Sequence, residues 1–89
     1  MIEIIIQEDA LTDLNNIRMF YENFSEQTSQ NVITDIYNAI DVLTLFPESG
    51  AKKSLGRRHA HSIKYRYTIS YLFNKNKVRV IGVYKHQNR

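Results

Sequence analysis

The spacing of hydrophobic positions changes twice along the chain and divides it into three parts. Residues 2–6 (IEIII) form a short β-rich run that ends at a polar residue, which predicts a strand. Apolar residues then recur every three or four positions, which predicts amphipathic helices over residues 9–24 and 26–46. Because almost no chain separates the two helices, we expect them to form an antiparallel hairpin.

The ends of the predicted helices carry recognisable signals. Asp9 and Ser25 are the expected N-caps, because their side-chain oxygens can accept a hydrogen bond from a free backbone N–H group of the first helical turn. Pro47 should end the second helix, because proline disfavours helical geometry in the residue before it. Residues 47–56 contain the only proline of the chain and two of its three glycines, so we predict a loop there.

Three β-like runs follow this loop, at residues 57–63, 66–73 and 77–86. A two-residue turn at Lys75 and Asn76 would join the last two runs into a hairpin. This turn would pair Phe73 with Val78, Tyr71 with Val80, and Tyr67 with Tyr84. The apolar face of the hairpin would consist of Tyr67, Ile69, Tyr71, Phe73, Val78, Val80 and Tyr84. The opposite, cationic face would carry Arg66, Thr68, Ser70, Arg79 and Lys85.

The order of these elements is β-α-α-β-β-β, which predicts an α+β fold in a single domain over residues 1–89. The helical hairpin should pack on one face of a small antiparallel sheet. The chain has no cysteine, which excludes disulfides and thiol chemistry. No apolar run reaches the roughly 20 residues that cross a bilayer, and Glu3 lies where a signal peptide needs a basic residue. We therefore expect a cytoplasmic protein without membrane contact.

Charge is divided between the two halves of the chain. All nine Asp and Glu residues lie before residue 49, where Arg18 is the only basic residue. From Lys52 onward the chain has eleven Lys or Arg residues and no acid. The halves carry −8 and +11, which sum to the net charge of +3. Because solvated surfaces usually mix their signs, this separation indicates an anionic partner or ligand, with chance segregation as the alternative.

Four segments of the chain form a recognisable series. They are ALTDLNNI at residues 10–17, LTLFPESG at 43–50, YTISY at 67–71 and HQNR at 86–89. Together they resemble the RelE/ParE superfamily, the toxins of bacterial type II toxin–antitoxin modules. The resemblance implies the fold predicted above and an antitoxin protein as partner. We expect no cofactor. It also implies one of two targets, which are DNA gyrase for ParE-like members and messenger RNA on the ribosome for RelE-like members.

The resemblance also identifies catalytic candidates. RNA-cleaving members commonly carry an arginine directly after the first tyrosine of the middle strand, where this chain has Thr68. Arg66 lies two residues earlier on the same face of the predicted strand, so it could substitute only if the site were displaced by about 7 Å. Lys52 and Lys53 match lysines that RelE-like members often use, and His86 could transfer protons near neutral pH. Arg66, His86, Lys52 and Lys53 are therefore the candidates if the protein is a ribonuclease.

Thr68 nevertheless argues against a nuclease, and the H-x-x-R tail is more typical of ParE-like members. We therefore favour a protein that poisons gyrase by binding and performs no chemistry of its own. The expected target-binding residues are Arg57, Arg58, Arg66, Lys85, His86 and Arg89. A ribosome-dependent mRNA endonuclease and an inert nucleic-acid-binding relative are the alternatives.

His59 and His61 alternate like strand residues and share a face. No third ligand lies at a suitable spacing, so we predict no metal site and expect both histidines to face solvent. Among the tyrosines, Tyr65 is the one expected to be exposed. The tyrosines expected in the core are Tyr67, Tyr71 and Tyr84.

Overall fold

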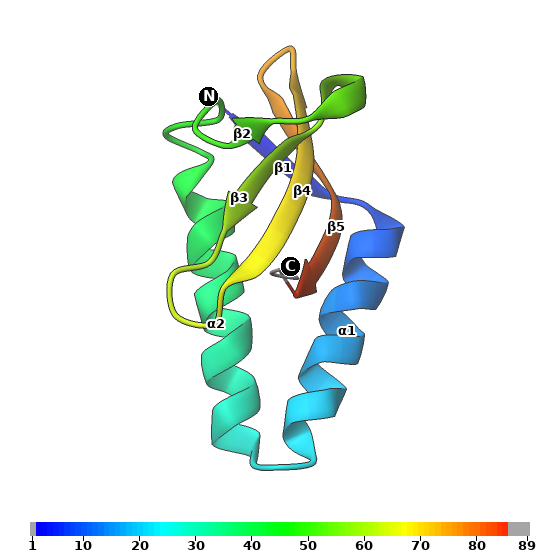
Figure 1. Ribbon diagram of the computed structural model, residues 1–89, viewed down its shortest axis with the longest axis vertical. Helices are drawn as coiled ribbons and strands as arrows, with labels where there is room; N and C mark the ends of the chain where they lie inside the picture. The colour runs from blue at the N-terminus through cyan, green and yellow to red at the C-terminus, as the bar shows by residue number, and fades with distance from the viewer. Residues whose placement is uncertain (1, 86–89) are drawn as a thin grey trace.

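The structure has two layers, a helical hairpin and a sheet (Figure 1). The computed structural model describes residues 2–85. Helices α1 (Glu8–Glu22) and α2 (Glu26–Val42) pack against each other and cover one face of the sheet. The strands are β1 (Glu3–Ile6), β2 (Ala51–Lys52), β3 (Arg58–His61), β4 (Tyr67–Asn74) and β5 (Lys77–Lys85), and a short 3-10 helix, η1 (Ser54–Gly56), lies between β2 and β3. The predicted α+β class is confirmed. Within residues 2–85, neither α-helix is long and apolar enough to cross a membrane.

The sheet is mixed and contains one strand more than predicted. The strand order is β1-β5-β4-β3-β2. β1 is parallel to β5, and all other neighbours are antiparallel. Parallel pairing needs a long connection, which the two helices and the intervening strands provide here. The additional strand β2 lies inside the predicted loop 47–56, where Ala51 pairs with His59 and Lys52 pairs with Arg58.

The start of α2 agrees with the sequence prediction, whereas the start of α1 does not. α1 begins at Glu8, and its N-cap is Gln7 rather than Asp9, with no capping hydrogen bond from the Gln7 side chain. Asp9 lies in the first helical turn, where a negative charge is favourable beside the free N–H groups. Ser25 is confirmed as the N-cap of α2, because its Oγ accepts a hydrogen bond from the Thr28 N–H at 2.9 Å.

Both helices end earlier than predicted, α1 by two residues and α2 by four. After Val42 the chain tightens into a turn. The Leu43 N–H donates to the Ile40 carbonyl and the Leu45 N–H to the Val42 carbonyl, each three residues back. Pro47 lies beyond this turn, so the tightened turn rather than the proline ends the helix.

A β-bulge shifts the register of the β4–β5 hairpin. Near the turn the prediction is confirmed, because Phe73 pairs with Val78 and Tyr71 with Val80. The next residue of β4, Ser70, pairs with Gly82. Ile81 is therefore an extra residue on β5, as in a bulge where two residues of one strand oppose one residue of the other.

The bulge corrects the predicted faces of β5. Tyr67 pairs with Lys85 rather than with Tyr84, and Tyr84 pairs with Thr68. Tyr84 is consequently 45% exposed on the face away from the helices, whereas Val83 points into the core and is 2% exposed. The predictions that Tyr84 lies in the core and that Lys85 lies on the cationic face are therefore wrong. One extra residue reverses the faces of all the residues that follow it in β5, because side chains alternate between faces along a strand.

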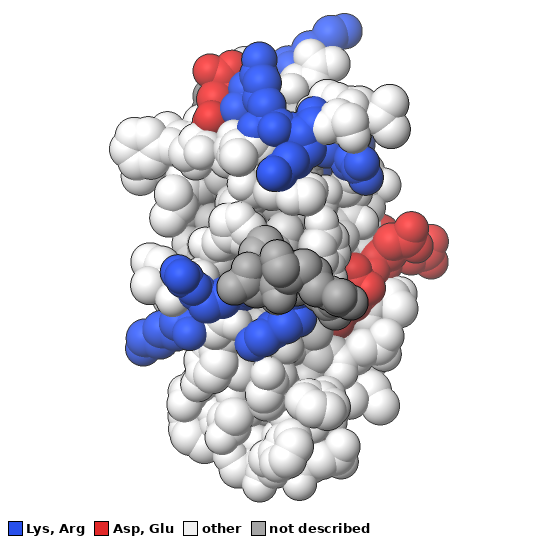
Figure 2. All heavy atoms as spheres, in the orientation of Figure 1, with Lys and Arg blue, Asp and Glu red and all other residues white. Residues whose placement is uncertain are grey.

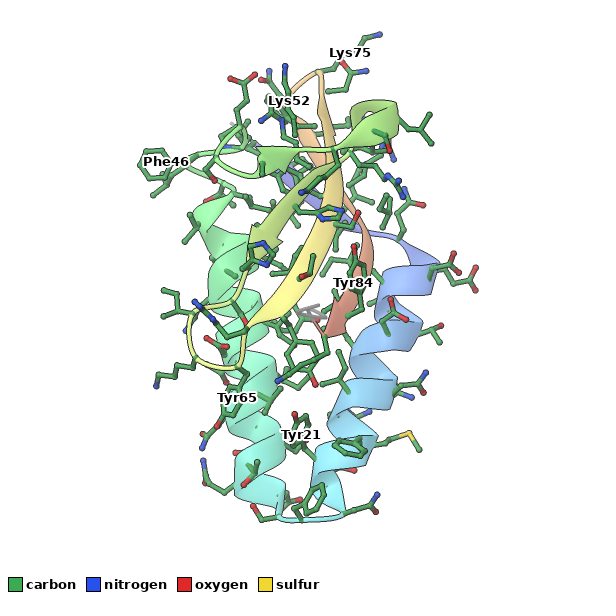
Figure 3. All side chains as sticks on the ribbon, viewed as in Figure 1. Tyr21, Phe46, Lys52, Tyr65, Lys75 and Tyr84 are labelled. Atoms are coloured by element: carbon green, nitrogen blue, oxygen red, sulfur yellow. The ribbon has the colours of Figure 1, made fainter. Side chains whose placement is uncertain are left out.

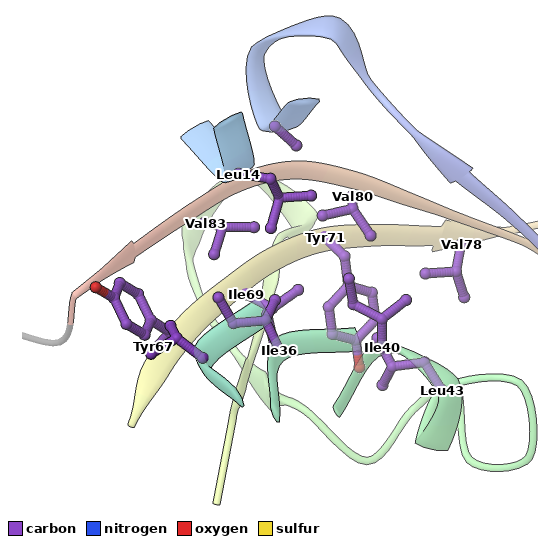
Figure 4. Packing of buried hydrophobic residues seen from close by; sticks show 12 residues of the cluster. Leu14, Ile36, Ile40, Leu43, Tyr67, Ile69, Tyr71, Val78, Val80 and Val83 are labelled. Atoms are coloured by element: carbon purple, nitrogen blue, oxygen red, sulfur yellow. The ribbon is translucent and has the colours of Figure 1, made fainter. Parts of the chain in front are cut away.

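The core lies between the helices and the inner face of the sheet (Figure 4). Its buried hydrophobic residues are Ala10, Leu14, Val32, Ile36, Ile40, Leu43, Tyr67, Ile69, Tyr71, Val78, Val80 and Val83. The predicted burial of Tyr67 and Tyr71 is confirmed. Tyr65 is half-buried rather than exposed, because it packs at the edge of this core with its ring 6.5 Å from that of Tyr21.

Two aspartates, one on each helix, accept hydrogen bonds from backbone N–H groups that have no partner in a neighbouring strand. β1 covers only the first half of β5, and Asp13 Oδ2 accepts from the Val83 N–H at 3.0 Å in the second half. Asp35 accepts from the N–H groups of Lys64 and Tyr65 at 3.1 and 2.8 Å, in the connection between β3 and β4. These bonds tie both helices to the strands that form the outer face of the sheet.

Candidate functional site

The outer face of the sheet, which points away from the helices, gathers polar side chains from three strands. His59 and His61 of β3 are opposite Ser70 and Thr68 of β4, respectively. Thr68 is in turn opposite Tyr84 of β5. Figure 3 shows the Tyr84 ring over this face of the sheet. We call His59, His61, Thr68, Ser70 and Tyr84 the outer-face cluster.

Each histidine of the outer-face cluster has a hydroxyl partner. The Tyr84 hydroxyl lies 3.3 Å from His59 Nε2, and the two rings meet edge to face with centroids 6.1 Å apart. The Thr68 Oγ1 lies 3.2 Å from His61 Nδ1. Both histidines therefore have a hydroxyl partner on this face. His59 is half-buried rather than solvent-facing, whereas His61 is exposed as predicted.

The electrostatic environment favours a neutral His59. Partial burial lowers the pKa of His59 below its usual value, and the positive charges of Lys53 and Arg57, together with His61, lower it further. A neutral imidazole keeps a lone pair that can accept the Tyr84 hydroxyl proton or a proton from a bound ligand. The cluster thus combines a proton acceptor, a phenol and neighbouring cations.

The predicted basic residues of the β2–β3 region have different roles. Lys52, at the end of β2, and Lys53 are both exposed. The Arg57 side chain donates to the Ser54 carbonyl at 3.3 Å and shapes the η1 turn. Arg58 Nη1 donates to two loop carbonyls, of Glu48 at 2.9 Å and of Gly50 at 3.0 Å, on the helix side of the sheet. Arg58 therefore holds the loop before β2.

The remaining predicted residues do not join the outer-face cluster. Arg66 is exposed and has a φ of 61°, so it belongs to the turn before β4 and does not share the outer face with Thr68 as predicted. Lys85 lies over the Tyr67 ring, with Nζ 4.8 Å from the ring centroid, and it donates to the Tyr65 carbonyl at 2.8 Å. His86 and Arg89 lie outside the described residues.

Most cations of the second half have no acidic partner within residues 2–85. Ten Lys or Arg residues lie between residues 52 and 85. In the described part of the chain, the ion pair within 4 Å joins Arg18 to Glu22 on α1, and none involves these ten residues. Figure 2 shows two groups of Lys and Arg on the visible face. Unpaired cations of this kind can attract an anionic partner.

An apolar groove of about 620 Å³ borders the outer-face cluster, between α2 and the edge of β3. Its apolar lining includes Ala39, Val42 and Ala60. β2 pairs only with Arg58 and His59, so among the described strands none covers β3 at Ala60. A groove beside an open strand edge can accept an extended segment of another protein.

The sequence-based prediction missed Tyr84 and His59 as site residues. Their pairing depends on the bulge at Ile81, and the local signal for it was Gly82, because a glycine inside a strand often marks a bulge. The sequence showed that His59 and His61 alternate and share a face. It did not show which side chain each histidine would bind. Within residues 2–85, no group of three or more His, Cys, Asp or Glu side chains is placed to hold a metal ion.

Comparisons with known proteins place this arrangement in a known fold. No protein-family model and no curated protein matches the sequence. Among solved structures, a chain of the chromosomal ParDE toxin–antitoxin (TA) system from P. aeruginosa is similar with a TM-score of 0.85, at 14% identity, over 98% of each chain. The conserved hypothetical protein HP0894 from Helicobacter pylori is similar with a TM-score of 0.58, at 16% identity, over 97% of this chain and 96% of that one. The chain therefore shares the fold of this ParDE-system chain, in agreement with the α+β fold that the sequence predicted.

Proposed function

We propose that this chain is the toxin of a type II toxin–antitoxin module and acts in the cytoplasm. The observation that carries the proposal is the similarity, over 98% of each chain, to a chain of a ParDE toxin–antitoxin system. The apolar groove between α2 and β3 supports a protein partner, because it offers both apolar surface and an open strand edge. We expect that partner to be an antitoxin encoded in the adjacent reading frame.

DNA gyrase is the target that we favour. The outward positions of β4 hold Thr68, Ser70 and Leu72, so no arginine lies on the outer face of β4 itself, although Arg79 of β5 lies opposite Leu72. Thr68 is also almost completely buried and is hydrogen-bonded to His61. The lack of an arginine at the position of Thr68 supports a surface that acts by binding, because a ribonuclease needs a cation close to the reacting phosphate.

The His59–Tyr84 pair favours mRNA cleavage as a second candidate function. A neutral His59 could take the proton of a ribose 2′-hydroxyl, whose oxygen then attacks the adjacent phosphorus. The Tyr84 hydroxyl could give its proton to the departing 5′-oxygen as the P–O bond breaks. Lys53 and Arg57 are close enough to affect the charge of His59 and could stabilise the phosphate in the transition state.

Expression of the chain alone should arrest bacterial growth, and co-expression of the adjacent reading frame should restore growth. The purified chain should inhibit gyrase supercoiling and leave mRNA intact on translating ribosomes. Colony counts, a supercoiling assay and primer extension on mRNA measure the three outcomes. Normal growth at verified expression would contradict the toxin proposal, and mRNA cleavage without gyrase inhibition would replace gyrase by the ribosome as target.

Variants of the tail and of His59 should separate binding from proton transfer. If the chain binds gyrase, deletion of residues 86–89 should abolish growth arrest. His59→Gln and His86→Gln should then each weaken gyrase inhibition by less than about tenfold, since truncating an ordinary contact residue costs about 1 kcal/mol. If the chain cleaves mRNA, His59→Gln should slow cleavage by roughly 10²- to 10⁴-fold, the usual contribution of a general base. His61→Gln is the matched control, because His61 bonds to Thr68 rather than to Tyr84.

A further inference from the structure

Leu55 is exposed in a backbone conformation that leucine rarely adopts. It lies in η1 with a φ of 63° and a ψ of 30°, and it is 87% exposed. A left-handed conformation is costly for a branched side chain, and full exposure returns no packing energy. The Arg57 side chain, bonded to the Ser54 carbonyl, helps to hold this turn. The fold therefore presents an apolar side chain to solvent without a structural gain.

Cations from two separate segments lie at the same end of the molecule as the η1 turn that carries this leucine. Together they form what we call the cationic end: Lys52, Lys53, Arg57, Lys75, Lys77 and Arg79. Figure 3 shows Lys52 and Lys75 at the same end of the molecule. A hollow of about 310 Å³ joins the two segments and is lined by Gly56, Leu72, Phe73, Asn74, Lys77 and Arg79. The strands and loop of this end also contain Glu3 and Glu48, but within residues 2–85 neither forms an ion pair with these cations.

We propose that the cationic end binds duplex DNA and that Leu55 inserts at a base step as an apolar wedge. Clustered Lys and Arg residues release counterions from the DNA backbone and supply sequence-independent affinity. Proteins that bend DNA through the minor groove commonly insert a leucine or another apolar side chain between base pairs. Leu55 is exposed as this role requires, and Lys52, Lys53 and Arg57 lie within three residues of it in the sequence.

Single-stranded nucleic acid fits this surface less well. Proteins that bind single strands stack bases on exposed aromatic rings. Among the described residues of the cationic end and its hollow, the aromatic ring is that of Phe73, which is half-buried against the core. The inference goes beyond the proposed toxin function, because DNA binding requires neither gyrase nor an antitoxin. An experiment can therefore disprove DNA binding without disproving the toxin function, and the reverse also holds.

The first test measures affinity with the purified full chain. Fluorescence anisotropy with a duplex of about 20 base pairs should show binding that weakens roughly a hundredfold between about 50 and 200 mM salt, as for about four phosphate contacts. The double variant Lys53→Gln/Lys75→Gln should reduce the slope of log affinity against log salt by about 1 to 2. Lys64→Gln is the control and should leave the slope unchanged, because Lys64 lies in the connection between β3 and β4.

The second test measures bending and isolates Leu55. Leu55→Gly should keep the fold, because glycine favours a φ of 63°, so its melting temperature should equal or exceed that of the wild type. Energy transfer between dyes at the duplex ends should reveal a bend of roughly 20–90° with the wild type and little bend with Leu55→Gly. Leu45→Gly is the matched control, because Leu45 is 75% exposed outside the cationic end. No binding at low salt, tighter binding to single-stranded RNA, or equal bending by both leucine variants would overturn the proposal.

Discussion

Replacing Gly50 with alanine should lower the free energy of unfolding by about 2–4 kcal/mol, from overpacking and a lost buried hydrogen bond. A Cβ atom at this position would lie 2.6 Å from the Tyr71 hydroxyl oxygen and 2.9 Å from Tyr71 Cε1. It would also lie 3.0 Å from the His59 carbonyl oxygen. These distances are too short for contact, and Tyr71 is fully buried, so its ring has little room to move.

The clash would also disturb a hydrogen-bonded junction beneath the site. The Gly50 N–H donates to the Tyr71 hydroxyl at 3.0 Å, and that hydroxyl donates to the Pro47 carbonyl at 2.8 Å. Arg58 binds the Gly50 carbonyl from the other side. Because β2 starts directly after Gly50 and pairs with His59, the junction positions one edge of the outer-face cluster.

Urea denaturation followed by circular dichroism measures this effect. Gly82→Ala is the matched control and should change stability by less than about 1 kcal/mol, because its Cβ would meet its nearest neighbour, Asp13 Oδ2, at an ordinary 3.7 Å. Tyr71→Phe removes the clashing hydroxyl, so the double variant Gly50→Ala/Tyr71→Phe should lose less than the sum of the two single changes. Equal losses for Gly50→Ala and Gly82→Ala would contradict the prediction.

Replacing Asp35 with alanine should lower the free energy of unfolding by a similar amount, about 2–4 kcal/mol. The Asp35 carboxylate is 6% exposed and accepts hydrogen bonds from the Lys64 and Tyr65 N–H groups. Alanine would leave both N–H groups without this partner in the turn between β3 and β4. Chemical denaturation at neutral pH measures the loss, and an effect below about 0.5 kcal/mol would show that water replaces the carboxylate without cost.

Asp35 should also make the fold sensitive to acid. Burial alone would raise the pKa of Asp35, but hydrogen bonds with Tyr65, Lys64, Ser62 and Ile63 together outweigh burial and leave the pKa below its usual value of 3.8. The carboxylate therefore binds protons less readily in the folded chain than in the unfolded chain. Its stabilising contribution is fully present above the unfolded pKa and is lost as the pH falls through the lower, folded value.

Denaturation at a series of pH values between about 6 and 2 tests this dependence. Asp35→Asn should lose less stability than the wild type over the acid range, because it cannot be protonated there. Glu48→Gln is the control, because Glu48 is exposed, and it should follow the wild type. Parallel acid curves for Asp35→Asn and the wild type would assign the acid sensitivity to other groups.

Local patterns determined the elements of this protein. The change from a spacing of three or four to alternation located the helical hairpin and four of the five strands, because each period matches the side-chain geometry of one element type. The two-residue strand β2 is too short to show a period and was predicted as a loop. Lys75 and Asn76 form the predicted turn with φ values of 53° and 63°, as a tight hairpin requires. The superfamily resemblance predicted the same fold, which the similarity to a ParDE chain supports at only 14% identity.

Tertiary structure decided which side chains meet. Alternation assigns a face only while the register holds, and the extra residue Ile81 moved Tyr84 outward to His59 and Val83 inward. Side chains also found partners far away in sequence, as where the Asp13 carboxylate accepts from the Val83 N–H. The sequence by itself therefore determined the two helices, four of the five strands and the charge of the second half. The composition of the site depended on the pairing register and on long-range hydrogen bonds, neither of which the local spacing of residues encodes.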